Sequence, residues 1–102
     1  MHIIRPDTIF EWDPKKEAEN IIKHGFSFRE ASEVFKYPDV AFLEDLKHSL
    51  EEIRYFAVGK IQRGVVLTVR CAVKGQVIRI FGAANWRKWR RFYEERKNSR
   101  SL

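Results

Sequence analysis

The sequence predicts an α+β domain in which a short strand and two helices precede an antiparallel meander of strands and a closing helix. Apolar residues recur at helical spacing in the first third of the chain, whereas three later stretches alternate apolar and polar residues. Aromatic residues then recur at spacings of three and four near the C-terminus. This segregation of helices and strands is typical of an α+β fold with the N-terminal helices on one face of the sheet.

The N-terminal part begins with residues 9–12, a short aromatic and β-branched run that predicts a strand. Asp13 followed by Pro14 predicts the start of a helix, and Gly25 has the place of a left-handed residue at its end. We expect the buried stripe of this helix to consist of Ala18, Ile21 and Ile22.

A second helix follows at once, because Ser27 and Glu30 have the spacing of a capping box. It should end before Pro38. Its predicted buried residues are Phe28, Ala31, Val34 and Phe35. Residues 40–43 then predict a short strand, and the charged residues 44–52 predict a mobile loop.

The meander is predicted from three strands over residues 53–59, 65–72 and 76–83, with turns at 60–64 and 74–75. The last helix should run from about residue 85 to 97, with Trp86, Trp89 and Tyr93 packed on the domain. We expect a flexible tail over residues 98–102. The 102 residues, 44% of them hydrophobic, suffice for one domain over residues 1–102.

Charge is divided unevenly along the chain. Residues 1–52 hold 7 Lys and Arg against 12 Asp and Glu, whereas residues 53–102 hold 13 against 2. This asymmetry and the net charge of +6 indicate an anionic partner for the second half.

Composition also excludes several classes. The single cysteine, Cys71, excludes an intrachain disulfide and a zinc finger, and it favours a reducing compartment. No apolar run is long enough to cross a membrane, so we expect a cytoplasmic protein without membrane contact. No motif indicates a metal ion or another cofactor.

The predicted strands separate their side chains into two faces, because alternate residues point to opposite sides. One face is apolar and should lie under the helices. The other carries one arginine from each strand, Arg54, Arg70 and Arg79, beside Phe56 and Phe81. Guanidinium groups bind phosphates and aromatic rings stack on bases, so this face suits single-stranded RNA. Alternatively, these are ordinary exposed arginines paired with nearby glutamates.

The last helix interleaves aromatic and basic residues. If the aromatic side chains pack inward, a basic face is left that can contact phosphates through charge alone. Its members are Arg87, Lys88, Arg90 and Arg91.

His48 precedes Arg54 in the charged loop and could reach the arginine-bearing face. There it could act as a general base toward a ribose 2′-hydroxyl, although an exposed histidine without a role is the alternative. His24 ends the first helix, where a cation favours the helix dipole, and a structural role is expected for it.

Several local motifs together resemble the BrnT toxin family. The N-terminal part of the match comprises Glu11-Trp12-Asp13-Pro14, Lys16, Asn20, Lys23-His24-Gly25 and Phe28-Arg29-Glu30-Ala31. The later part comprises Val34-Phe35, His48-Ser49, Glu52, Arg54, Gly59, Ile78-Arg79-Ile80 and Tyr93-Glu94. The resemblance covers roughly residues 9–95.

The resemblance implies a RelE-like fold and the toxin of a type II toxin–antitoxin pair. It further implies metal-independent RNA cleavage that arrests translation, and neutralisation by a DNA-binding, BrnA-like antitoxin. Operator DNA would be contacted only through that antitoxin. Inhibition of a topoisomerase by the same fold is a further alternative, with no motif in this chain to support it.

Under this hypothesis RNA lies across the arginine-bearing face. Arg54 and Arg79 would stabilise the charge that develops on the phosphate, and Arg70 would position the RNA. His48 or Glu52 would assist proton transfer.

The chain departs from the family's pattern at two places. Many members have Ser-Ala-Arg after the last strand, where this chain has Gly82-Ala83-Ala84. Many also have a glutamate in the last helix where this chain has Trp89. These departures leave an alternative hypothesis, a degenerate toxin-like protein that binds its partners without cutting RNA.

Overall fold

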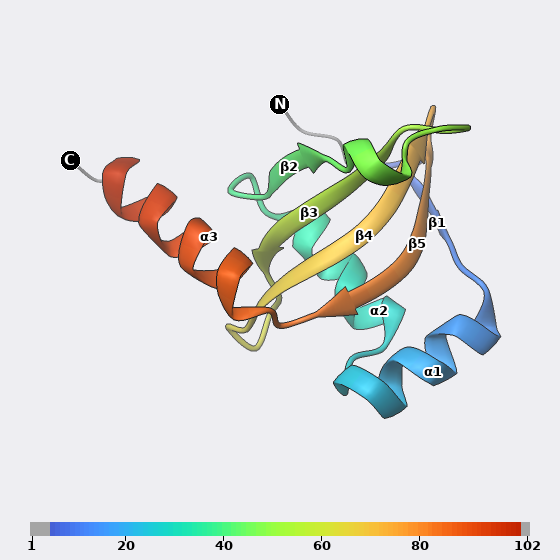
Figure 1. Ribbon diagram of the computed structural model, residues 1–102, viewed down its shortest axis with the longest axis horizontal. Coiled ribbons are helices and arrows are strands. Elements are labelled where there is room, and N and C mark those ends of the chain that lie inside the picture. The colour runs from blue at the N-terminus through green and yellow to red at the C-terminus, as the bar shows by residue number, and fades with distance from the viewer. Residues whose placement is uncertain (1–4, 101–102) are drawn as a thin grey trace.

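The computed structural model describes residues 5–100, with side chains described through residue 98. A five-stranded sheet with the order β1-β5-β4-β3-β2 forms its centre (Figure 1). The strands are β1 (Ile9–Glu11), β2 (Ala41–Glu44), β3 (Arg54–Lys60), β4 (Val66–Lys74) and β5 (Val77–Ala84). The helices are α1 (Pro14–His24), α2 (Phe28–Ala31) and α3 (Arg87–Arg100), with 3₁₀ turns η1 (Ser32–Lys36) and η2 (Leu46–His48).

The predicted fold class is confirmed, since β2 to β5 form an antiparallel meander accompanied by two N-terminal helices and one C-terminal helix. One feature was not predicted. The first strand joins the far edge of the sheet and runs parallel to β5, with Ile9 paired to Val77. A parallel pairing needs a long crossover, which the segment from α1 to β4 supplies.

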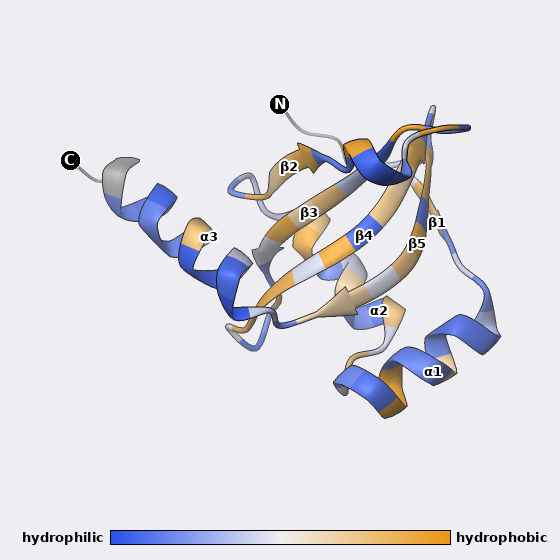
Figure 2. Cartoon of the chain, in the orientation of Figure 1, coloured by the Kyte–Doolittle hydropathy of each residue, from blue (hydrophilic) through white to orange (hydrophobic). Residues whose placement is uncertain are grey.

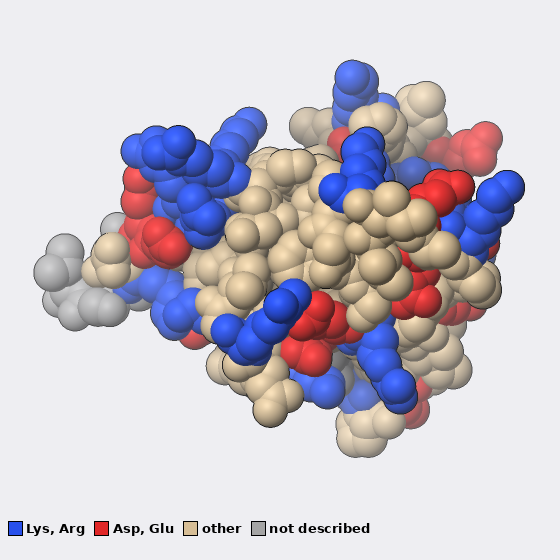
Figure 3. All heavy atoms as spheres, turned by 90° about the horizontal axis from the view of Figure 1, so that it is seen from below, with Lys and Arg blue, Asp and Glu red and all other residues tan. Residues whose placement is uncertain are grey.

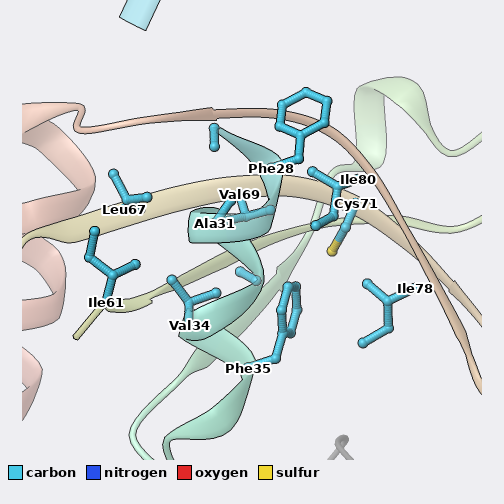
Figure 4. Packing of buried hydrophobic residues seen from close by; sticks show 12 residues of the cluster. Phe28, Ala31, Val34, Phe35, Ile61, Leu67, Val69, Cys71, Ile78 and Ile80 are labelled. Carbon is cyan, nitrogen blue, oxygen red and sulfur yellow. The ribbon is translucent and has the colours of Figure 1, made fainter. Parts of the chain in front are cut away.

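The main core lies between the sheet and the α2–η1 segment, as predicted. Phe28, Ala31 and Val34 are 0% exposed and Phe35 is 4% exposed. They pack against inward-facing residues of the meander (Figure 4), which include Leu67, Val69, Cys71, Ile78 and Ile80. Burial raises the pKa of the Cys71 thiol to about 12, so this thiol is protonated and unreactive at neutral pH.

The predicted apolar stripe of α1 is wrong. Ile22 is 88% exposed and Ile21 is 46% exposed, and the buried residue of this helix is Asn20. Its side-chain nitrogen donates to the Ala83 carbonyl at 2.9 Å, and its oxygen accepts from the Ala83 N–H at 3.1 Å. Ala83 lies beyond the segment of β5 that pairs with β1, so its backbone groups need a polar partner there. The helix therefore turns a polar stripe toward the sheet, and Figure 2 shows it as largely hydrophilic.

The predicted start and end of α1 and the predicted start of α2 are confirmed by their caps, whereas the second helix ends at Ala31 and continues as the 3₁₀ turn η1 instead of running on toward Pro38. The Asp13 carboxylate accepts from the Lys15 N–H, and Gly25 ends α1 with a φ of 81°. Ser27 caps α2 by accepting from the Glu30 N–H.

The charged loop that was predicted to be mobile contains η2, and hydrogen bonds join its two ends. The Asp45 N–H donates to the Arg54 carbonyl at 2.7 Å, which extends the β2–β3 pairing by one residue. The Ser49 hydroxyl donates to the Asp45 carbonyl at 2.6 Å and accepts from the Arg54 N–H at 3.0 Å. These bonds hold the loop next to the start of β3.

The last helix packs on the face of the sheet opposite α2. Tyr93 is 1% exposed and shares a small second core with Val58 and Val66. Trp89 stacks on Phe56, with ring centres 5.3 Å apart. The helix begins two residues later than predicted and continues through Arg100, so residues 98–100 belong to it and 101–102 lie outside the described residues.

Candidate functional site

The sheet register brings the three predicted arginines to one face. Arg54 pairs with Ala72, and Ala72 pairs in turn with Arg79 on β5. Arg70 points to the same side, opposite Phe56 on β3 and Gly82 on β5. Because α3 covers the other end of this face, the arginines occupy its open end. Strand spacing places the Cα atoms of Arg54 and Arg79 about 10 Å apart.

A bulge in β5 determines how Phe81 lies. Arg70 pairs with Gly82 whereas Cys71 pairs with Ile80, so Phe81 is an extra residue without a partner on β4. Simple alternation does not predict this irregularity.

Arg54 reaches from β3 across the intervening strand β4 to Phe81. Its guanidinium carbon lies 4.2 Å from the centre of the Phe81 ring. Its Nη2 lies 3.5 Å from a carboxylate oxygen of Glu52. Its Nε is buried and has no hydrogen-bond partner within the described part of the chain. A buried donor without a partner is uncommon, and a bound oxygen would satisfy it.

A hollow of about 290 Å³ lies beside Arg54, between α1 and the sheet. We call it the basic hollow. Its lining is Lys16, Glu19, Asn20, Lys23, His24, Arg54, Arg70 and Phe81. Four cationic side chains face one carboxylate there, so the hollow favours an anion.

A second hollow of about 260 Å³ lies on the other side of Arg54, and we call it the histidine hollow. It is lined by Lys47, His48, Leu50, Glu51, Glu52 and Arg54. Three of the four predicted catalytic residues, His48, Glu52 and Arg54, therefore meet in one place. The imidazole of His48 is 53% exposed and accessible to a ligand.

The fourth predicted catalytic residue, Arg79, lies apart from the histidine hollow. Its Nε donates to a carboxylate oxygen of Glu11 at 3.0 Å. It also lines a neighbouring hollow together with Glu52. Pairing with glutamates, expected as the alternative for these arginines, thus applies to Arg79 and to Arg54. Arg70 makes no ion pair with any residue described.

Arg70 lies directly over Gly82. A Cβ atom at Gly82 would meet Nη2 of Arg70 at 2.7 Å, so a larger residue there would displace the end of this flexible side chain. Gly82 is the first residue of the segment that departs from the family's pattern. Ala84, where that pattern has an arginine, is 2% exposed.

The remaining nucleic-acid-binding candidates lie around α3. The ring face of Phe56 that Trp89 covers is not available to a base, so the prediction of Phe56 as an open stacking surface is wrong on that side. The predicted basic residues of the helix remain at least partly exposed, and Figure 3 shows Lys and Arg gathered over α3 at the left. They are Arg87, Lys88, Arg90 and Arg91.

Sequence reasoning assigned the basic surface to the second half of the chain and missed Lys16, Lys23 and His24. Asn20, Lys23 and His24 follow Lys16 by four, seven and eight residues. At these spacings the four side chains lie on one side of α1. That spacing was a signal, but a search for apolar stripes does not detect it.

The described residues were also compared with the requirements of a metal site and of a membrane-spanning helix. Among residues 5–100, no cluster of three or more His, Cys, Asp or Glu side chains is arranged to hold a metal ion. No helix in the same range is both long enough and apolar enough to span a membrane.

The fold and the charges define a small basic α+β protein whose open sheet face suits a polyanion. The sequence pattern of a family described as "Ribonuclease toxin, BrnT, of type II toxin-antitoxin system" matches residues 12–90. The chain therefore belongs to the BrnT family of ribonuclease toxins of type II toxin–antitoxin systems, as its motifs predicted.

The crystal structure of the ribonuclease toxin BrnT from Brucella abortus is similar to this chain with a TM-score of 0.59 and 18% sequence identity. The similarity covers 78% of this chain and 97% of the Brucella chain. At that identity the likeness shows the fold alone. Among curated proteins, no sequence matches the chain.

Proposed function

We propose that this chain is an active endoribonuclease that cuts single-stranded RNA without a metal ion and so arrests translation in the cytoplasm. A BrnA-like antitoxin with a DNA-binding domain neutralises it, and operator DNA is contacted only through that antitoxin. Membership of a family of ribonuclease toxins supports the reaction and the existence of an antitoxin partner. One observation carries the assignment of the site: Arg54 lines both hollows and holds a buried N–H donor without a partner.

The basic hollow holds the RNA backbone in this proposal. Lys16, Lys23 and Arg70 lie where they can neutralise a phosphate. The guanidinium of Arg54 lies on the ring of Phe81, and such a plane can also stack on an unpaired base. The basic residues of α3 contact flanking phosphates through charge.

The reaction takes place beside the histidine hollow. The ribose 2′-oxygen attacks the adjacent phosphorus, and its proton passes to His48 or Glu52. The bond to the 5′-oxygen breaks, which leaves a 2′,3′-cyclic phosphate and a 5′-hydroxyl that takes a proton from solvent. Arg54 stabilises the negative charge that develops on the phosphate oxygens. Arg79, across β4 on the same face, is the second stabilising cation.

The test is an assay with purified protein, a labelled single-stranded RNA and EDTA. We expect the wild type to produce fragments that end in a cyclic phosphate. Arg79→Ala should lose cleavage, whereas Arg29→Ala, which removes an exposed arginine from α2, should retain it. Intact RNA with the wild type from about pH 6 to about pH 9 would overturn the proposal.

A second candidate function, binding without cleavage, is favoured by one observation. Ala84 is buried where the family's pattern has an arginine, so this face lacks one cation. In our proposal Arg70, which lies over Gly82, supplies a cation close to this position. Induced expression separates the two, because an active toxin stops growth and an inert binding protein does not.

A further inference from the structure

We propose that Asp45 is the positioning residue for His48. It fixes the neutral imidazole with its proton on Nδ1, so that Nε2 keeps a free lone pair for proton transfer. This inference rests on the proposed function, in which His48 is a candidate base, and it adds a residue that the sequence did not suggest.

The geometry of the pair supports this assignment. Oδ2 of Asp45 lies 2.8 Å from Nδ1 of His48. An ionised carboxylate accepts hydrogen bonds only, so Nδ1 of a neutral imidazole must carry the proton. The other ring nitrogen, Nε2, is then the acceptor. The side chain of Asp45 is 10% exposed and that of His48 is 53% exposed, so a buried carboxylate orients an accessible ring.

The backbone holds Asp45 in register with Arg54. Asp45 lies directly opposite Arg54, where the loop leaves β2 and enters β3. The N–H of Asp45 donates a hydrogen bond to the Arg54 carbonyl. Ser49 bridges the same two residues through its hydroxyl. The orientation of His48 is therefore coupled to the strand position that carries Arg54.

Asp45 does not serve the common structural purpose of an aspartate at this position. It precedes η2, where an aspartate usually caps a helical turn by accepting from a backbone N–H. Its side chain makes no such bond, and the carboxylate is directed to His48 instead. A loop-stabilising ion pair is the competing explanation, and such a role does not require a particular tautomer.

The first test is nitrogen-15 NMR of the imidazole side chains in the wild-type protein, at a pH where the histidines are neutral. We expect the shifts of His48 to show Nδ1 protonated and Nε2 unprotonated. His24 serves as an internal comparison. The partner of its ring is the aromatic ring of Trp86, with 5.9 Å between the ring centres, whereas the partner of His48 is a carboxylate. A His48 that is protonated mainly on Nε2, or that averages both forms, would overturn the proposal.

The second test is Asp45→Asn. The amide that replaces the carboxylate can donate to Nδ1 of His48, which would shift the imidazole proton to Nε2 and remove the base. We expect kcat for RNA cleavage to fall by about 10²-fold or more with little change in KM. Asp7→Asn, which changes an exposed aspartate in the same way, should leave kcat unchanged. An unchanged kcat in Asp45→Asn would contradict the positioning role.

The two tests separate this inference from the proposed function. The tautomer in the wild type is measured without RNA and decides the geometry even if Asp45→Asn does not fold. Failure of the proposed function appears elsewhere, as wild-type protein that leaves RNA intact.

Discussion

The guanidinium carbon of Arg54 lies 4.2 Å from the centre of the Phe81 ring, although the two residues belong to strands separated by β4. The ring holds an otherwise flexible side chain across the open sheet face. Arg54 thereby lines both the basic hollow and the histidine hollow. In our proposal, this contact joins RNA binding on one side to proton transfer on the other.

Phe81→Leu should reduce RNA cleavage, because leucine fills space but lacks the electrostatic attraction of an aromatic ring for a cation. A cation–π contact contributes about 0.5–2 kcal/mol. The rate should therefore fall about 2-fold to 30-fold if the contact acts in the transition state. Phe81→Tyr, which keeps the ring, is the matched control and should stay close to wild type. Equal rates for the leucine and tyrosine variants would show that the ring does not act on Arg54.

Asn20→Ala should destabilise the fold, because it leaves the N–H and C=O of Ala83 without their side-chain partner. Each buried polar group left unpaired costs about 1–3 kcal/mol, so the two groups together predict a loss of roughly 2–6 kcal/mol in the free energy of unfolding. Urea titration followed by tryptophan fluorescence measures it. Ile22→Ala, at the exposed position that helical periodicity assigns to the core, should change stability by less than about 0.5 kcal/mol. A larger effect at Ile22 than at Asn20 would contradict the observed orientation of α1.

Lys16→Ala and Lys23→Ala should weaken RNA binding and lower its dependence on salt. Each phosphate contact to single-stranded nucleic acid contributes about 0.7 to the slope of log affinity against log salt. The double variant should thus lower the slope by about 1.4 if each lysine makes one contact. Lys15→Ala, a neighbouring exposed lysine outside the basic hollow, is the control. An unchanged slope in the double variant would place the RNA elsewhere.

Cys71 should make stability depend on pH only in the alkaline range. Burial raises its pKa from 9.0 to about 12, so the folded protein retains the thiol proton more strongly than the unfolded chain does. The resulting stabilisation is fully present below about pH 9 and is lost as the pH rises toward 12. Native protein should resist iodoacetamide at about pH 8 and react after denaturation in urea. Rapid alkylation of the native protein at that pH would show that the thiol is accessible.

Much of the fold could be predicted because its elements follow simple periodicities. Alternation with a period of two determined which residues of the meander face the helices, since a shift by one residue would bury the arginines. Phe28, Ala31, Val34 and Phe35 were predicted correctly for the same kind of reason. Each lies on the apolar side of a segment that packs on a sheet.

The errors arise where a residue's environment depends on a distant segment. Periodicity identified the isoleucines of α1 but could not show that this helix lies beside unpaired backbone of β5, where Asn20 is the better partner. The bulge at Phe81 is a register change between two strands, which the alternation of apolar and polar residues does not reveal. The pair of Asp45 and His48 has a visible spacing of three, but only the turn at η2 brings the two side chains together.

The role proposed for Arg54 is tested most sharply by the single-turnover rate of RNA cleavage by Arg54→Ala at saturating RNA, measured beside the wild type and Arg29→Ala. Loss of one preorganised donor to a developing negative charge costs about 10²–10³-fold in rate. We predict a loss of that size in Arg54→Ala and a wild-type rate in Arg29→Ala. Cleavage by Arg54→Ala at the wild-type rate would contradict the assignment of the site.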